Sequence, residues 1–323
     1  MNKYNTHSDL AKESLELLKE GKHYKRFIEK MDNFSIETYE FLEDTDYLKK
    51  GKYIEIFFKE SFMSISQHVT RLLKEMIDQN DYPRILIIGL GNPYLTSDAI
   101  GPRTLRDIRV THYLDDGLKL ENHYYDILSL TPGVMYQTGV ETVEVIQAMV
   151  DQFQIDLVIA IDALCARDYQ KLGHVIQINN VGIHPGSGIG NHRQAIQEET
   201  LGCPVIAIGV PTVIYASSIV RDVFQLMKDY FGDALDIKNK LKIGKRKKYE
   251  GELSASQQQY LLGHVGSLEQ EELESLLYEI LTPVDRNFVM SDKQIDETVE
   301  KVSAILSILD LFHIFEYIQG ERL

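Results

Sequence analysis

Short, almost continuous apolar runs alternate with helical patterns through the middle of this 323-residue chain. Such runs are typical of strands that are covered on both faces of a sheet. Apolar residues spaced three or four positions apart indicate amphipathic helices between and after them. The predicted strands span 84–91, 125–130, 157–164, 174–180 and 204–210, and the predicted helices span 139–153 and 215–232. This alternation predicts an α/β fold with a central, mostly parallel sheet flanked by helices.

More polar sequence surrounds this region at both ends. Residues 52–60 alternate between polar and apolar side chains, which favours a further strand. Helical spacing recurs at 9–21, 64–80, 271–281 and 299–318. We therefore expect peripheral N- and C-terminal elements packed on the outside of the sheet.

The composition excludes a disordered chain, a collagen-like fibre and a disulfide scaffold, since 44% of the residues are hydrophobic and 26% are charged. The formal charge of −15 argues against a direct nucleic-acid role. Residues 238–248 are an exception, with seven Lys or Arg and no acid. They read as a solvated loop, and contact with a partner or nucleic acid is the alternative.

The cysteines and the absence of two targeting signals indicate the compartment. The two cysteines, Cys165 and Cys203, lie in apolar surroundings and read as inert core thiols of a reducing compartment. No signal-peptide h-region opens the chain, and no apolar run reaches the length of a membrane span. We expect a cytoplasmic protein with no membrane partner.

The first candidate for chemistry is Asp98, in the segment IIGLGNPYLTSDAIGP at 87–102. The segment fails as a dinucleotide-binding loop because Tyr94 stands where the third glycine belongs. Asp98 follows the glycine-rich turn and precedes a predicted helix. Taken alone, Asp98 is better explained as a cap of that helix.

The second candidate is Asp162, which follows five apolar residues of a predicted buried strand. A carboxylate there must be paired, hydrogen-bonded or functional. In open α/β sheets the carboxyl ends of strands form the usual ligand crevice. Asp98 and Asp162 could share that crevice, either as an acid and base that activate water or as oxygen ligands of a divalent metal ion.

The third candidate is a glycine-rich loop, GIHPGSGIGNHRQ at 182–194. Its free backbone N–H groups could grip a peptide or stabilise an oxyanion. His184 is a candidate auxiliary group, as a proton shuttle or metal ligand, or else an ordinary hydrogen-bonding residue. Ser187 lacks the strand and elbow sequence of a serine nucleophile. The proposed substrate-cleft positions are Gly186, Ser187, Gly188, Asn191 and Arg193.

Together these motifs resemble the bacterial spore germination protease family, endopeptidases that degrade small acid-soluble spore proteins. The matching segments cover nearly the whole chain and include LIIGLGNPYLTSDAIGPR, IDALCAR, GIHPGSGIGNHR and TLGCPVIAIGVPTVI. The resemblance implies a phosphorylase/hydrolase-like α/β fold. It also implies that Asp98 and Asp162 are the two essential aspartates. Aspartic-type and metal-dependent mechanisms both exist as classifications of the family, and a divalent metal stays open.

The resemblance further implies a self-processing zymogen. Its propeptide would be residues 1–9, cut between Asp9 and Leu10, and residues 10–323 would form a single peptidase domain. The family prefers an acidic residue before the cut, then a hydrophobic residue and alanine. His7 and Ser8 replace the more usual Arg-Thr before the aspartate. Family members are homotetramers of the spore core.

Two other functions stay open from the sequence. One is a maturation-type metallopeptidase that trims a specific partner protein. The other is a catalytically silent protein that binds spore proteins or nucleic acid. Retention of both aspartates disfavours the silent protein.

Overall fold

The computed structural model describes residues 8–15, 24–45, 48–58, 63–77, 84–121, 125–184, 194–235, 251, 253–281 and 288–307. The chain divides into two compact units. The larger comprises His7–Ala166, Gln170–Val213 and Ser291–Leu323, and the smaller comprises Met1–Thr6, Arg167–Tyr169 and Ile214–Met290.

The larger unit is built on a mixed β-sheet. Its strands lie in the order β1-β2-β3-β7-β8-β6-β4-β5. Their bounds are β1 Tyr24–Lys30, β2 Phe34–Phe41, β3 Gly51–Phe58, β4 Arg84–Gly89, β5 Asp126–Leu130, β6 Leu157–Ala166, β7 Val175–Asn179 and β8 Val205–Tyr215. β4 pairs in parallel with β5 and β6. The pairs β1–β2, β2–β3, β3–β7 and β7–β8 are antiparallel.

The α/β class with a helix-flanked central sheet is confirmed. The sheet is mixed, whereas the sequence pattern predicts a mostly parallel one. The difference arises because β1, β2 and β3 form an antiparallel meander that joins the central strands through β7. β1 and β2 are so rich in charged residues that their apolar runs are short.

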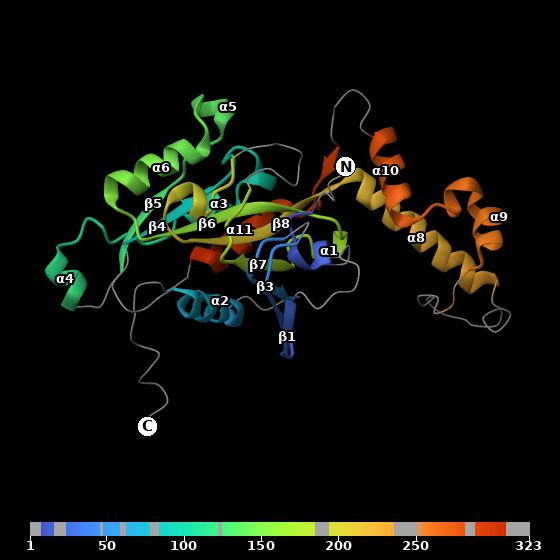
Figure 1. The fold of residues 1–323 in the computed structure, drawn as a ribbon, viewed down its shortest axis with the longest axis horizontal. Coiled ribbons are helices and arrows are strands. Elements are labelled where there is room, and N and C mark those ends of the chain that lie inside the picture. The colour runs from blue at the N-terminus through green and yellow to red at the C-terminus, as the bar shows by residue number, and fades with distance from the viewer. Residues whose placement is uncertain are drawn as a thin grey trace. The chain divides into compact units, whose positions relative to one another are not determined.

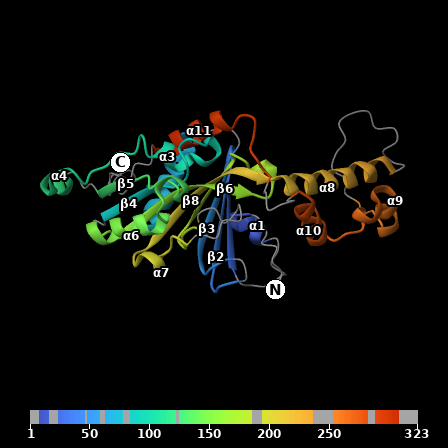
Figure 2. The same ribbon diagram turned by 90° about the horizontal axis from the view of Figure 1, so that it is seen from above.

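Helices cover both faces of this sheet, as Figure 2 shows for α3 and α11 on one side and α6 on the other. Residues of β6 alternate between the two cores: Ile159 packs with Ile100 of α3, and Val158 packs with Ile146 of α6. The helices of the larger unit are α1 Ala11–Leu15, α2 Met63–Met76, α3 Ile100–Thr104, α4 Asp116–Glu121, α5 Met135–Thr138, α6 Thr142–Phe153, α7 Glu198–Leu201 and α11 Ile295–Ser307.

The smaller unit is mainly helical, and Figure 1 shows its helices in gold and orange. It contains α8 Ala216–Leu235, α9 Ala255–Gly266, α10 Gln270–Leu281 and β9 Val289–Met290. β9 pairs with Ile214 and Tyr215 at the end of β8. The predicted helices at 215–232 and 271–281 are confirmed. The basic run 238–248 lies outside the described residues.

Within the described part of the chain, no helix combines the length and the apolarity needed to cross a membrane.

Candidate functional site

Asp162 lies inside β6, which continues to Ala166, and not at the carboxyl end of the strand, where the sequence places it. It directly follows Ile161, the last residue of β6 that pairs with β4. Asp162 is only 5% exposed, and its Oδ1 accepts a hydrogen bond of 2.8 Å from the backbone N–H of Ala163. In the parallel ladder, Ile161 pairs with Gly89 at the end of β4. Asp162 therefore stands at the edge where the chain leaves β4, the usual ligand edge of parallel strands.

Asp98 ends a short 3₁₀ turn, η1 (Thr96–Asp98), that follows β4. Its Oδ2 accepts a hydrogen bond of 2.8 Å from the backbone N–H of Asn92. Gly91 permits this closure, since its φ is +110° and an added Cβ would lie 2.0 Å from the Asp98 carbonyl oxygen. The loop is thus folded back on itself, with the Asp98 carboxylate beside the strand end.

The backbone of α3 brings this loop against β6. A Cβ on Gly101 would lie 2.4 Å from the Leu90 oxygen and 2.5 Å from the Ile161 oxygen, so only glycine fits this contact. η1 itself packs against β6. The structure therefore places the Asp98 loop and Asp162 at the same edge of the β4–β6 pair.

The N-terminal segment Ser8–Leu15 crosses one face of the same sheet. At β6, Asp9 and Cys165 exchange two hydrogen bonds. At β7, Gln177 bonds to both Asp9 and Ala11. At β3, Glu55 accepts from the backbone N–H of Lys12 at 2.7 Å. These contacts hold consecutive backbone groups of the segment, and we call the part of the sheet face that carries it the peptide groove.

The side chains after Asp9 fill two apolar pockets of this groove. Leu10 is fully buried against residues of β6 and β7, and Ala11 is fully buried against aromatic rings of β2 and β3. The Leu10 pocket is formed by Leu164, Ala166 and Val175, with Phe57, Leu172 and Ile183 at its rim. The Ala11 pocket is formed by Tyr39, Phe41 and Tyr53. The groove thus suits a large apolar residue followed by a small one.

Buried charges lie under the segment. The Nζ of Lys171 is 3.3 Å from Oε1 of Glu13 and 3.9 Å from Oε2 of Glu55. Burial raises the pKa of the Glu55 carboxyl, and the charge of Lys171 opposes this only in part. An ion pair therefore ties the segment to the 3₁₀ helix η2 (Tyr169–Lys171), in addition to its hydrogen bonds with the sheet.

A cavity of about 180 Å³ lies beside Asp9 in this unit. Its wall includes Gln177, Asn179 and His184. Burial lowers the pKa of His184, and the nearby charge of Lys49 lowers it further. A neutral imidazole can accept a proton, so His184 keeps its predicted auxiliary role as a candidate. Gly186, Ser187, Gly188, Asn191 and Arg193 lie outside the described residues.

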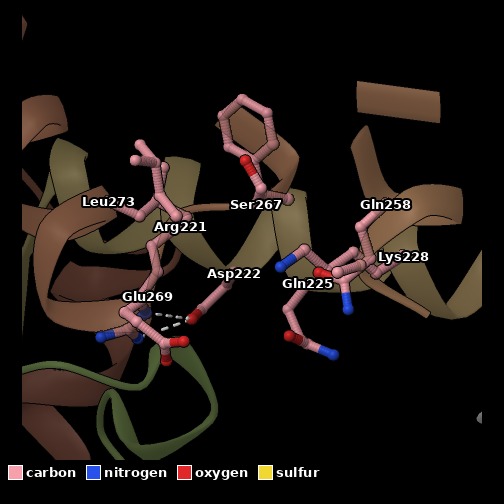
Figure 3. A pocket seen from close by; sticks show the side chains of 11 residues that line it. Arg221, Asp222, Gln225, Lys228, Gln258, Ser267, Glu269 and Leu273 are labelled. Atoms are coloured by element: carbon pink, nitrogen blue, oxygen red, sulfur yellow. Dashed lines mark hydrogen bonds and ion pairs between the residues drawn. The ribbon is translucent and has the colours of Figure 1, made fainter. Parts of the chain in front are cut away.

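A second cavity of about 500 Å³ lies within the smaller unit, between α8, α9 and α10. Figure 3 shows Arg221 on its wall bound to Asp222. Arg221 is also paired with Glu274, so its charge is already neutralised. This cavity holds none of the candidate residues from the sequence.

The cysteines are buried, as predicted, and both are free thiols. Burial raises the pKa of Cys203 to about 11, so this thiol stays protonated at neutral pH. Across the described residues, no group of three or more His, Cys, Asp or Glu side chains is arranged to hold a metal ion.

The sequence analysis missed Gln177, Glu55 and Lys171. The first two left a signal, since each is a single polar residue between apolar neighbours of a strand, in VIQIN and YIEIF. Lys171 left none, because it lies in a short 3₁₀ helix outside the strands.

Comparison with known proteins gives one consistent result. The family model described as germination protease matches residues 44–310. A germination protease of Bacillus pumilus (strain SAFR-032) is 37% identical over 279 residues, which cover 82% of this chain and 72% of the relative. Another, from Bacillus mycoides (strain KBAB4), is 32% identical over 340 aligned residues, covering 95% of this chain and 93% of the relative.

Proposed function

The chain belongs to the germination protease family, and we propose that it starts the degradation of small acid-soluble, DNA-binding proteins in the spore core. It is a hydrolase, an endopeptidase that acts in spore germination. The observation that carries the proposal for this chain is the edge formed by Asp98 and Asp162 beside a groove that already holds a peptide segment.

In the proposed reaction, Asp98 and Asp162 activate a water molecule. One carboxylate takes a proton from the water as its oxygen attacks the peptide carbonyl carbon. The other, in its acid form, gives a proton to the leaving nitrogen as the C–N bond breaks. The products are a new carboxyl group and a new amine. Burial of Asp162 and the folded-back Asp98 loop support these roles, because both carboxylates are held in place at one edge of the β4–β6 pair.

The test replaces Asp162 with Asn and measures cleavage of a basic DNA-binding spore protein. We expect cleavage to fall at least 10³-fold while the melting temperature stays near that of the wild type, on the order of magnitude seen when one catalytic group is removed. Asp156→Asn is the matched control, because this exposed aspartate lies just before the other end of β6. Full activity in Asp162→Asn would contradict the assignment. Repeating the assay with a chelator separates water activation by the two carboxylates from a metal-dependent reaction.

We also propose that residues 1–9 are a propeptide cut between Asp9 and Leu10, and that residues 10–323, both units included, form the peptidase. Support comes from the Leu10 and Ala11 pockets, which match the hydrophobic residue and alanine expected after the cut. While Ser8–Leu15 fills the groove, a substrate cannot enter, so this form is latent until the cut after Asp9 frees Leu10–Leu15 to leave the groove. Mass spectrometry at mildly acidic pH tests the cut. Loss of residues 1–9 alone is the expected result.

Assembly as a homotetramer is part of the same proposal. Exposed apolar side chains on α8, namely Val223, Leu226 and Tyr230, offer a surface for contact between copies. Light scattering should give about four times the 37.1 kDa mass of one chain. Leu226→Lys should lower that mass if this surface is used.

A further inference from the structure

The side-chain amide of Gln177 makes two hydrogen bonds to the N-terminal segment. Its Oε1 accepts from the backbone N–H of Ala11 at 2.7 Å, and its Nε2 donates to the backbone carbonyl of Asp9 at 3.0 Å. The N–H of Ala11 can only donate, so the amide oxygen must face it. The amide nitrogen is then fixed toward the oxygen of Asp9.

This oxygen belongs to the peptide bond that joins Asp9 to Leu10. If the chain is cut there, attack of water on the Asp9 carbonyl carbon turns that oxygen into an oxyanion. We propose that Gln177 is a catalytic residue whose Nε2–H group stabilises this oxyanion, in self-processing and in peptide substrates bound in the same place. The inference rests on the proposed function, since it takes Asp9–Leu10 as the bond that is cut.

The surroundings of Gln177 suit this role. The residue is 4% exposed and stands in the middle of the sheet, opposite Glu55 on β3 and Gly209 on β8. A donor fixed in a buried strand does not have to reorganise when charge develops, and the low dielectric around it strengthens its bond to an anion. Glu55 holds the next backbone group along the segment, at Lys12, so the peptide cannot easily rotate away from Gln177.

The position also fits the proposed water-activating pair. Leu164 packs against Leu10, and it lines the 180 Å³ cavity together with Asp9 and Gln177. Side chains two residues apart on a strand share a face, so Asp162 projects on the same side of β6 as Leu164, about 7 Å further along. The cavity beside the Asp9 carbonyl offers room for the attacking water.

The experiment follows the full chain at mildly acidic pH with two readouts. Mass spectrometry gives the rate constant for loss of residues 1–9, and hydrogen exchange of the Leu10, Ala11 and Lys12 amides reports whether the segment stays docked. In Gln177→Met we expect processing to slow by about 10²–10³-fold, as for loss of one oxyanion donor. The amides of Leu10 and Lys12 should remain protected, because the Asp9–Cys165 and Lys12–Glu55 bonds are intact.

Two results overturn the inference while leaving the proposed function standing. One is an unchanged processing rate in Gln177→Met. The other is slow processing accompanied by rapid exchange at all three amides, which shows that Gln177 only holds the segment. If Gln177→Met fails to fold, Gln177→Asn decides, since it keeps an amide but withdraws it by about 1.5 Å, one carbon–carbon bond, and should also slow processing. Wild-type chain that is never cut after Asp9 overturns the proposed processing itself. Gln225→Met, on α8, is the matched control and should behave as wild type.

Discussion

Asp9 and Cys165 hold each other by two reciprocal hydrogen bonds. The backbone N–H of Asp9 donates to the Cys165 carbonyl at 3.0 Å, and the backbone N–H of Cys165 donates to Oδ2 of Asp9 at 2.9 Å. The residue before the proposed cut is therefore fixed on the strand that carries Asp162. The Asp9 carboxylate therefore helps to hold the segment on β6, in addition to its proposed part in recognition of the Asp9–Leu10 peptide bond.

Replacing Asp9 with Ala should loosen the segment, because the buried N–H of Cys165 loses its acceptor. Leaving one such group unsatisfied costs about 1–3 kcal/mol, and each 1.4 kcal/mol is a tenfold change in the equilibrium. We expect the Leu10 and Ala11 amides to exchange at least about fivefold faster with solvent. Asp9→Asn keeps an acceptor oxygen and should exchange like the wild type. Equal exchange rates in the Ala and Asn variants would contradict this role of the carboxylate.

Glu37 on β2 anchors the segment through Lys12, whose Nζ lies 3.0 Å from its Oε1. Burial acts to raise the pKa of Glu37, but hydrogen bonds from Tyr39, Lys12 and Arg26 outweigh it and bring the pKa to about 2. A carboxyl whose pKa is lowered by folding stabilises the fold above its ordinary pKa and loses that effect as pH falls through the lowered one. This contribution should vanish between about pH 5 and pH 2.

The matching measurement is the free energy of unfolding of Glu37→Gln against pH. The variant should be less stable than wild type at pH 7 by about 1 kcal/mol, since the group is partly solvated, and the difference should disappear near pH 2. Glu40→Gln is the control, because Glu40 lies on the same strand as Glu37 and forms an exposed ion pair with Lys25. A constant difference across this range would contradict the lowered pKa.

Glu55 should behave in the opposite sense. Burial raises its pKa, so the folded chain disfavours the ionised form, with Lys171 opposing this only in part. The resulting loss of stability is absent below the ordinary pKa and grows as pH rises toward the raised one. Glu55→Gln keeps an acceptor for the Lys12 N–H and should raise the melting temperature at pH 7 but not at pH 4. A lower melting temperature at pH 7 would contradict this prediction and show that the ion pair of Glu55 with Lys171 stabilises the fold.

The sequence predicts the strands that carry the candidate site because these are continuous apolar runs. Asp162 stands out for the same reason, as a charge that interrupts such a run in β6. β1 and β2 escape prediction because they pair mainly with each other and with β3, so charged residues line their outer face. The hydrophobic pattern of a segment therefore predicts a strand well when the strand is buried on both faces, and poorly when one face is exposed.

The peptide groove is harder to predict, because its two sides are far apart in the chain. Gln177 and Ala11 are separated by 166 residues, and no local spacing connects them. The polar position in VIQIN indicates that something must satisfy a buried amide, but not what. Likewise, the bond from Asn92 to Asp98 depends on a backbone turn that only the positive φ of Gly91 reveals.

Glu274 should support the smaller unit. Its carboxylate lies between two buried guanidinium groups, pairing with Arg167 at 2.7 Å and with Arg221. Glu274→Ala removes the carboxylate that pairs with both guanidinium groups. This should lower the free energy of unfolding by about 2–3 kcal/mol, which is less than the loss expected for a fully buried ion pair. Glu279→Ala, an exposed position on the same helix, should change stability by less than about 0.5 kcal/mol. Thermal unfolding of the two variants provides the comparison.

The Asp98 loop offers a test of the site that leaves both aspartates in place. Gly91→Ala would put a methyl group 2.0 Å from the Asp98 carbonyl oxygen, so the loop must move. Displacing a reacting group by about 1 Å can lower activity by about 10²-fold. Gly139→Ala is the matched control: its φ of +72° imposes a similar backbone strain, but no atom lies within 4 Å of the added carbon. Both variants should lose about 1 kcal/mol of stability or more, whereas only Gly91→Ala should lose most of its cleavage of a spore-protein peptide. Equal loss of cleavage in both would remove the Asp98 loop from the proposed active site.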